Sequence, residues 1–277
     1  PLWLQGDVAF GVISQVVMAF QASLSALSVV IRKFRSVSSL VAEGARLEGL
    51  AEALGRADAG APVALPVQVC GRGIEVRGLS LWLPSGAPLC RDLSLALEPG
   101  QRLLVLGRSG VGKTTLVRTL AGLWADGEGT VRRAASSVFL PQDPYVPEGS
   151  LRRILTFPAD AGIPIGDAEV LAAAGAARLG GVLERYALDA VADWEAVLSR
   201  GEQQRCAFCR LLLARPDLAV LDEATSALDA ENEAALYAAL EAPCVVSVGH
   251  RASLRGLHTR VLRLESDGRW RMEEPAA

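Results

Sequence analysis

A glycine-rich segment at residues 107–114 carries the residue types that bind phosphate. It fits the pattern G-x-x-x-x-G-K-[ST], in which glycines let backbone N–H groups close around phosphate oxygens. An apolar run at residues 103–106 predicts a buried strand before it, and residues 115–123 have helical spacing after it. This order places the positive N-terminus of a helix against the phosphates, which favours a nucleoside triphosphate site over a glycine-rich turn that fits the pattern by chance. The residues predicted to contact the nucleotide here are Gly107, Arg108, Ser109, Gly110, Val111, Gly112, Lys113, Thr114 and Thr115.

A second chemical feature is an apolar run at residues 218–221 that ends in two carboxylates, Asp222 and Glu223. A magnesium–nucleotide site needs an acid at a strand tip near the phosphate-binding loop. We expect Asp222 to hold Mg²⁺, directly or through water, beside the hydroxyl of Thr114. Glu223, one residue further on, is placed to polarise a water molecule for attack on the γ-phosphate. The acidic pair by itself is weak evidence for a nucleotide site, but together with the phosphate-binding loop it predicts nucleotide hydrolysis.

The composition limits the class of protein. The 277 residues suffice for one large domain, or for one domain with an appendage, and they are 51% hydrophobic with a mean hydropathy of +0.29. A formal net charge of −3 does not favour nucleic acid as a partner. Five scattered cysteines, an odd number, predict reduced thiols that face the cytosol or a similar compartment. The first residue is Pro1 and no signal-peptide pattern is present, so we expect a fragment that begins inside a longer protein.

The N-terminal region contains a candidate membrane span. Residues 8–31 carry no charge and exceed the roughly 20 residues that cross a bilayer, although glutamines and serines dilute them. Such a mixture suits a helix packed among other helices, and the basic residues Arg32, Lys33 and Arg35 place its C-terminal end in the cytosol. The alternative interpretation is a buried helix of a soluble domain.

The rest of the chain alternates between strand and helix patterns. Helical spacing continues through residues 36–54, and residues 55–68 are rich in Gly, Ala and Pro, as in a linker. Short apolar or alternating runs then predict strands, and helices dominate after residue 150. This alternation after a phosphate loop predicts an α/β sheet domain with ligands at the carboxyl ends of its strands.

Residues 198–205, Leu-Ser-Arg-Gly-Glu-Gln-Gln-Arg, resemble the LSGGQ signature of ATP-binding cassette (ABC) proteins. Other motifs of that family stand in the family's order: Gln142 in residues 140–143, residues 226–229 after Glu223, and His250 in residues 247–251. The motifs cover roughly residues 72–265, so the chain is identified as a member of the family. The resemblance implies an α/β P-loop NTPase fold: a RecA-like core with an antiparallel β subdomain and a helical subdomain, preceded by a transmembrane helix.

The resemblance also implies roles for single residues. Lys113 would contact the β- and γ-phosphates, Glu223 would be the general base, and His250 would contact the γ-phosphate. Gln142 would sense the metal and couple to the membrane part. Ser199, Gly201 and Gln203 would close over ATP bound to a second cassette, since a serine beside a glycine at a helix start offers donors and a positive dipole to an anion. The implied catalytic residues are Lys113, Glu223 and His250, the metal residues are Thr114, Gln142 and Asp222, and the additional nucleotide residues are Gln142, Ser199, Gly201, Gln203 and Asp229.

Two departures from the family pattern matter. Arg200 takes the place of a signature glycine, and Glu202 precedes the glutamines. The form Leu-Ser-x-Gly-Glu-Gln-Gln-Arg resembles half-transporters related to the peroxisomal fatty-acyl transporters (subfamily D) and to bacterial permease–ATPase proteins of the SbmA/BacA-related type. The position that often stacks on adenine falls at Leu83, and neighbouring Trp82 points to the other face if the strand register holds. The sequence therefore leaves three alternatives open: weak stacking on the base, stacking by Trp82, or stacking by another residue.

Three further features have both a structural and a functional interpretation. Cys206 and Cys209 have the spacing of half a zinc site, but without a second pair they are expected in the core. His258 has no neighbouring carboxylate cluster and is expected to be structural. Arg152 and Arg153 suit either a contact with the membrane domain or a solvated face.

The sequence therefore predicts the C-terminal part of an ABC half-transporter, a permease fused to an ATPase. Residues 1–54 would end the transmembrane domain, with its last helix at about 8–31 and a cytosolic extension. Residues 55–71 would form a linker and residues 72–277 the nucleotide-binding domain, with its helical subdomain at about 143–214. ATP and Mg²⁺ would bind between two cassettes, in a homodimer or a heterodimer of half-transporters.

The expected partners are that second cassette, the transmembrane helices of the same protein and membrane lipid, with no nucleic acid. The protein would be integral to a membrane, with this domain on the cytosolic or an equivalent side, such as the stromal one. The alternatives are a soluble ABC ATPase that is not involved in transport and a module that holds ATP without hydrolysing it.

Overall fold

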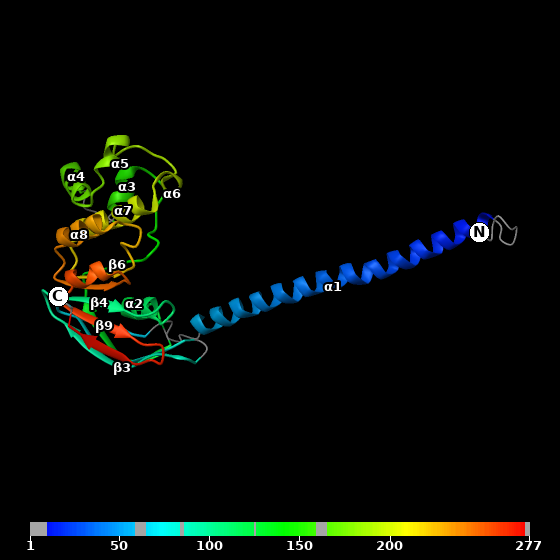
Figure 1. Cartoon of the computed structure of the whole chain (residues 1–277), viewed down its shortest axis with the longest axis horizontal. Coiled ribbons are helices and arrows are strands. Elements are labelled where there is room, and N and C mark those ends of the chain that lie inside the picture. The colour runs from blue at the N-terminus through cyan, green and yellow to red at the C-terminus, as the bar shows by residue number, and fades with distance from the viewer. Residues whose placement is uncertain (1–9, 59–64, 84–85, 125, 159–164, 275–277) are drawn as a thin grey trace. The chain divides into compact units, whose positions relative to one another are not determined.

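The computed structural model describes residues 10–58, 65–83, 86–124, 126–158 and 165–274. The chain divides into two compact units, Pro1–Ala61 and Pro62–Ala277. The described part of the first unit is a single helix, α1 (Phe10–Asp58), and the second unit holds all the strands and the other helices (Figure 1).

Helix α1 carries an apolar surface over its N-terminal half. Its stretch Gly11–Ser28, with a mean hydropathy of 1.3, is long and apolar enough to cross a membrane, and Met18, Phe20 and Leu27 are exposed on it. The hydroxyls of Ser23 and Ser28 donate hydrogen bonds to backbone carbonyls one turn earlier. Their polar groups are therefore satisfied within the helix, which lowers the cost of placing these serines in an apolar environment.

The predicted linker differs from the structure at both of its ends. Helix α1 continues through Asp58, because residues 55–58 (Gly-Arg-Ala-Asp) contain no proline and include the good helix formers Arg and Ala. Residues 67–70 form a strand, β1 (Val67–Cys70), which pairs in parallel with β5 (Gly127–Ala134). A strand of four residues whose partner lies far along the chain gives little local signal. The predicted helical stretches at 8–31 and 36–54 are likewise parts of one helix from residue 10 onward.

A six-stranded sheet forms the centre of the second unit, in the order β10-β9-β4-β8-β7-β6. All neighbours are parallel except the antiparallel edge strand β10. Every residue of β7 and β8 is buried, as expected of parallel strands covered on both faces. The strands are β4 (Arg102–Leu106), β6 (Ser137–Leu140), β7 (Leu218–Asp222), β8 (Cys244–Val248), β9 (Arg260–Leu264) and β10 (Trp270–Glu273).

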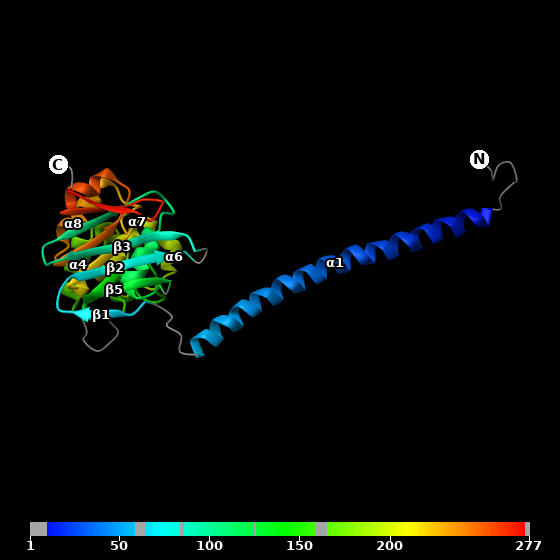
Figure 2. The ribbon, with the colours of Figure 1, turned by 90° about the horizontal axis from the view of Figure 1, so that it is seen from below.

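Alternate residues of these strands enter two separate hydrophobic clusters. Leu104 and Leu106 of β4 pack with the helices on one face, while Leu103 and Val105 pack with the opposite layer. That opposite layer consists of helix α2 (Lys113–Ala121) and a second sheet, in the order β1-β5-β2-β3 (Figure 2). The remaining strands of that sheet are β2 (Ile74–Trp82) and β3 (Pro88–Leu97), both antiparallel to their neighbours.

The helical face is built around α7 (Arg200–Ala214), whose side chains Phe208 and Leu211 are fully buried. Trp194 closes this layer, and its indole N–H donates to the carbonyl of Gly149 at 2.8 Å. The other helices are α3 (Leu151–Thr156), α4 (Asp167–Ala176), α5 (Gly180–Arg185), α6 (Trp194–Val197), α8 (Ala230–Ala239) and the 3-10 helix η1 (Ala252–Leu257).

Three residues for which the sequence allows both a structural and a functional role, Cys206, Cys209 and His258, are buried in this core. Burial raises the pKa of Cys206 and of Cys209 to about 12, so neither is a reactive thiolate near neutral pH. Burial also lowers the pKa of His258 to about 4, and its Nδ1 lies 2.7 Å from the carbonyl of Leu254. All three side chains therefore contribute to packing.

Candidate nucleotide site

The phosphate loop, residues 107–114, leaves no room for a side chain at two of its glycines. A Cβ on Gly107 would lie 2.7 Å from a methyl group of Val111, and one on Gly112 would lie 2.8 Å from Leu89. Gly112 also has a φ of +103° and occupies the N-cap position of α2, where no described side chain caps the first turn. The N–H groups of that turn are therefore available to an anion.

Lys113 places a positive charge at the loop. Its side chain is 8% exposed, and its Nζ donates to the carbonyls of Gly107 at 3.1 Å and Arg108 at 3.2 Å. Within the described residues no carboxylate pairs with this ammonium group. A buried charge of this kind is favourable when an anion completes its coordination, which matches the predicted phosphate contact.

Asp222 lies at the carboxyl end of β7, 5% exposed, and its Oδ1 is a buried acceptor without a hydrogen-bond partner among the described residues. Burial raises the pKa of this carboxyl, and the hydroxyl of Thr114 beside it offsets part of the shift. Thr114, Gln142 and Asp222 line one hollow of about 430 Å³. Hydroxyl, amide and carboxylate oxygens around an unpartnered buried acceptor are a donor set that fits Mg²⁺.

Glu223 starts the loop at residues 223–229 in an unusual backbone conformation. Its φ of +49° lies in the left-handed region, and its N–H donates to the carbonyl of Val248 at 3.1 Å. Its carboxylate lies 4.0 Å from Nδ1 of His250, a largely exposed side chain at the end of β8. The structure thus brings the predicted base and the predicted γ-phosphate contact together at the strand edge that holds Asp222.

The signature segment, residues 198–205, is hydrogen-bonded within itself. Ser199 caps α7 in a capping box with Glu202: the Ser199 hydroxyl and N–H each donate to Glu202 at 2.9 Å, and the Glu202 N–H donates back to the hydroxyl at 3.3 Å. Burial raises the pKa of Glu202, but the hydrogen bonds from Ser199 and the charges of Arg185 and Arg205 outweigh it and leave that pKa lowered. The spacing S-x-x-E at residues 199–202 is the sequence signal for this cap, which the comparison with the family signature does not use.

The other predicted signature residues also bond within the chain. The amide of Gln203 donates to the carbonyls of Glu195 and Leu198, so it braces the turn before α7. Gly201 faces Ala227, where a Cβ would lie 3.3 Å from the carbonyl oxygen. In the described part of the chain, no hydrogen bond or ion pair joins Ser199, Gly201 or Gln203 to the phosphate loop.

The remaining candidates have plain local roles. Asp229 caps α8 and accepts two hydrogen bonds from Asn232 at 2.8 Å. Trp82 ends β2 partly exposed while Leu81 is buried, so their side chains lie on opposite faces. Arg152 pairs with Asp167 in the helical layer.

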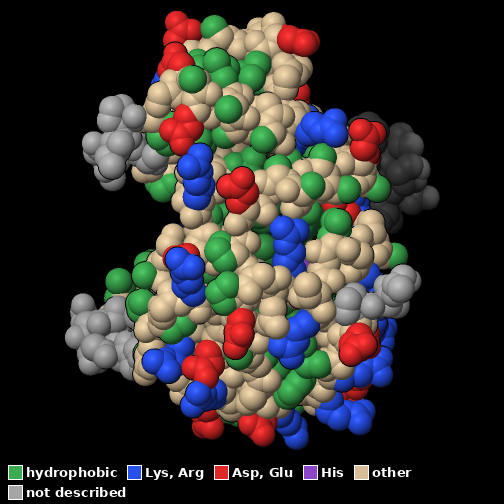
Figure 3. Space-filling view, turned by 90° about the vertical axis from the view of Figure 1, so that its left-hand side faces the viewer, with side chains coloured by type: hydrophobic (Ala, Val, Ile, Leu, Met, Phe, Trp, Pro, Cys, Tyr) green, Lys and Arg blue, Asp and Glu red, His purple; other side chains and the backbone are tan. Residues whose placement is uncertain are grey.

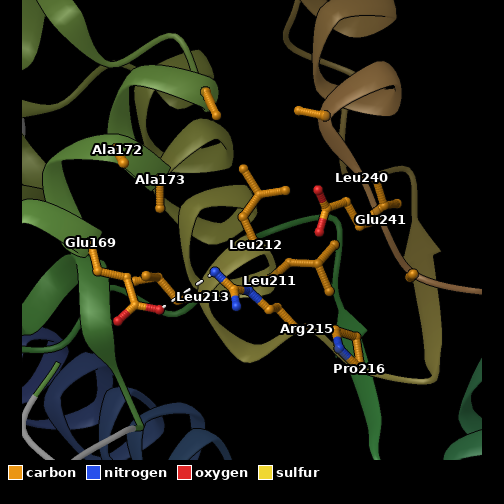
Figure 4. A pocket seen from close by; sticks show the side chains of 13 residues that line it. Glu169, Ala172, Ala173, Leu211, Leu212, Leu213, Arg215, Pro216, Leu240 and Glu241 are labelled. Atoms are coloured by element: carbon orange, nitrogen blue, oxygen red, sulfur yellow. Dashed lines mark ion pairs between the residues drawn. The ribbon is translucent and has the colours of Figure 1, made fainter.

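Two other surfaces of the second unit lack this chemistry. A pocket of about 280 Å³ lies among the ends of α4, α7 and α8, where Arg215 pairs with Glu169 at 3.7 Å (Figure 4). Its lining among the described residues includes no predicted site residue. On the face seen in Figure 3, acidic and basic side chains are interspersed.

The fold and this strand edge define a P-loop nucleotide-binding domain with a signature helix. The ABC transporter family model matches residues 90–226. The chain is 40% identical, over 98% of its length and 43% of the relative's, to an uncharacterized ABC transporter ATP-binding protein of Synechocystis. It is 31% identical to the chloroplastic ABC transporter D family member 2 of Arabidopsis thaliana, over 99% of this chain and 50% of the relative. It is 41% identical to the lysosomal cobalamin transporter ABCD4 of Homo sapiens, over 68% of this chain and 34% of the relative.

The fold has a known counterpart in a bacterial Atm1-family ABC exporter with ATP bound. The TM-score is 0.66 at 24% identity, over 77% of this chain and 41% of that one. The chain belongs to the ABC transporter family and carries its nucleotide-binding ATPase domain, so the predicted family and fold class are confirmed. It spans about half the length, or less, of the curated relatives described above.

Proposed function

We propose that the chain is the C-terminal part of an ABC half-transporter, in which magnesium-dependent ATP hydrolysis in a cassette dimer drives transport across a membrane. The observation that carries the enzymatic part of this proposal is the buried Oδ1 of Asp222, which has no hydrogen-bond partner among the described residues. It shares a hollow with Thr114 and Gln142 at the edge where the phosphate loop presents Lys113. Such an acceptor costs free energy unless a cation completes it.

Each of the residues at this edge has a separate role in the proposed reaction. The N–H groups of the loop and the ammonium of Lys113 bind the phosphates, and Thr114, Gln142 and Asp222 would hold Mg²⁺, which neutralises phosphate charge when bound. The carboxylate of Glu223 accepts a proton from the attacking water as its oxygen bonds to the γ-phosphorus and the bond to the β-phosphate oxygen breaks. His250 is placed to donate a hydrogen bond to the γ-phosphate.

The second wall of the site would come from another cassette. Ser199, Gly201 and Gln203 have no bond to the phosphate loop of their own chain within the described residues, and they stand at the start of a 15-residue helix. The positive end of that helix suits a phosphate, and a second cassette would supply it. Asp229, in the loop between Glu223 and α8, would lie at the same interface.

The membrane part of the proposal rests on α1. Its stretch Gly11–Ser28 would be the last transmembrane helix, surrounded by lipid and by other helices of the same protein, and Arg32, Lys33 and Arg35 would lie on the cytosolic or equivalent side.

Phosphate release from ATP by the purified full chain tests the enzymatic part. We expect release that depends on Mg²⁺ and that falls about 10²- to 10⁴-fold in Glu223→Gln, because the base is lost while nucleotide binding remains. Glu241→Gln, the same change at the pocket of Figure 4, should keep wild-type turnover. Undiminished release in Glu223→Gln, or ATP binding without any release by the wild type, would contradict the assignment.

Fractionation of cells that express the chain separates the membrane protein from a soluble ABC ATPase. We expect the chain in the membrane pellet after a high-salt wash and its release by detergent. Recovery in the supernatant without detergent would favour the soluble alternative.

A further inference from the structure

One buried side chain on α7 joins three of the segments described above. Gln204 is 4% exposed, and its Nε2 donates to the carbonyl of Gln142 at 3.3 Å and to the hydroxyl of Ser226 at 3.1 Å. Its Oε1 accepts from the N–H of Ala227 at 3.0 Å. A single amide therefore links the signature helix, the backbone of the predicted metal-sensing residue and loop 223–229.

Loop 223–229 needs such support because it begins at a strained residue. Glu223 holds a φ of +49°, a conformation that persists only where the surroundings enforce it. On one side of the loop, Arg251 donates to the carbonyls of Ser226, at 2.7 Å, and of Leu228. On the other side, the amide of Gln204 supplies the bonds from α7.

The phosphate loop does not share this dependence. The Nζ of Lys113 donates to carbonyls of its own loop, and Gly107 and Gly112 lie close to Val111 and Leu89, so none of these contacts involves Gln204. A change at Gln204 should therefore disturb the position of the base without disturbing the grip on the phosphates.

We propose that Gln204 is a positioning residue for hydrolysis, which fixes the direction of Glu223 through Ser226 and Ala227 and ties that direction to the position of Gln142. The proposal rests on the role of Glu223 as general base. It gives the chain a direct connection, inside one cassette, between the metal side and the base side of the site.

The chemistry of the amide makes the proposal testable. Only a group that donates and accepts can satisfy both Gln142 and Ala227. In Gln204→Glu the carboxylate keeps the bond from Ala227 but faces the carbonyl oxygen of Gln142 without a proton to donate. Gln204→Met keeps the volume and removes every bond, whereas Ser226→Ala removes one bond and leaves the side chain of Gln204 in place.

The experiment measures kcat and KM for magnesium-ATP on the purified full chain, with thermal unfolding of each variant. We expect kcat to fall about 10- to 100-fold in Gln204→Glu and Gln204→Met, as for a misplaced catalytic group, while KM stays near the wild-type value. In Ser226→Ala kcat should fall less. In the double variant with Gln204→Met the two losses of kcat should not add, because both changes remove the same contact. Gln101→Glu is the matched control, since the one hydrogen bond of the Gln101 side chain to the described residues is accepted from the N–H of Glu98, and a carboxylate can keep it.

The outcomes separate this proposal from the one on which it rests. Wild-type kcat in Gln204→Glu, or a raised KM at unchanged kcat, overturns the positioning role and leaves the ATPase assignment intact. If both Gln204 variants unfold, a lower kcat at unchanged KM in Ser226→Ala supports the positioning role, because this change removes only the bond to the Nε2 of Gln204, and full activity in Ser226→Ala overturns it. A wild-type chain without magnesium-dependent release contradicts the proposed function itself.

Discussion

The acidic strand edge and the start of α7 differ in whether their polar side chains already have hydrogen-bond partners. At the strand edge, Asp222 keeps a buried oxygen that no described group satisfies. At the start of α7, the Ser199 hydroxyl is fully engaged, donating to the Glu202 carboxylate and accepting from the Glu202 N–H. The first region is open to a cation, whereas the second is closed on itself until a stronger partner displaces Glu202.

Magnitudes show that such a displacement is feasible. An N-cap is worth about 0.5–2 kcal/mol, whereas each hydrogen bond to a charged group contributes about 1.5–3 kcal/mol. A phosphate that accepts bonds from Ser199 would replace bonds to the Glu202 carboxylate with bonds of the same charged kind, and the N–H groups of the first turn of α7 would add further ones. The capping box stabilises the start of α7, and under the proposed function it would yield to nucleotide bound by a second cassette.

The largest effect on this contrast is expected from Asp222→Asn. Loss of the carboxylate should raise the Mg²⁺ concentration needed for ATP turnover by at least about 10-fold, the range found when metal-site groups are removed. The same change should stabilise the metal-free fold by about 1 kcal/mol, since it removes the charge of a carboxyl group whose pKa is raised by burial and whose Oδ1 has no hydrogen-bond partner among the described residues. Magnesium titrations of activity and thermal unfolding in EDTA measure both effects. A lower melting temperature in EDTA would show that the Asp222 oxygen is satisfied.

Glu202→Gln should lower the stability of the fold, whereas Asp222→Asn should raise that of the metal-free fold. The variant weakens the capping box and the pairing with Arg185, so we expect a loss of about 0.5–2 kcal/mol, measured by urea unfolding. The pKa of Glu202 is lowered in the folded chain, so its stabilisation is complete above the usual value near 4.3 and is lost as the pH falls through the folded-state value.

The difference between wild type and Glu202→Gln should accordingly be full at pH 7 and should shrink below about pH 4. A difference that is constant from pH 7 to pH 3 would show that the carboxylate charge contributes nothing to the cap.

The smallest effect is expected from Asp143→Ala. Its carboxylate pairs with Arg200 at 2.7 Å, but both side chains are about three-quarters exposed. Such pairs contribute about 0–1 kcal/mol and weaken with salt, so the melting temperature should change little, and less still in 0.5 M NaCl. A loss comparable to that of Glu202→Gln would mean that Arg200, the departure from the family signature, is a structural tie to the segment after Gln142.

The two regions also differ in how far the sequence predicts them. The strand edge is predictable because apolar runs end at Asp222 and at the phosphate loop, and parallel strands bring their carboxyl ends together. The capping box has a local signal, Ser199 and Glu202 three residues apart, that is easily overlooked beside a stronger motif. The bonds of Gln204 have no local signal, since Gln142 and Ala227 meet only in the folded chain. Strand β1 likewise lacks a local signal, since its partner β5 lies far along the chain, and the sequence predicts a linker there.

Mixing two inactive variants of the full chain tests most directly whether one site is built from two chains. Lys113→Ala removes the charge of the phosphate loop, and Ser199→Asp keeps a good N-cap but sets a negative charge against the phosphate of a partner. Each variant alone should release little phosphate. Mixed and allowed to exchange, two copies should form one site with an intact loop from one chain and an intact signature from the other. The account predicts phosphate release well above the sum of the separate variants, and release equal to that sum would contradict it.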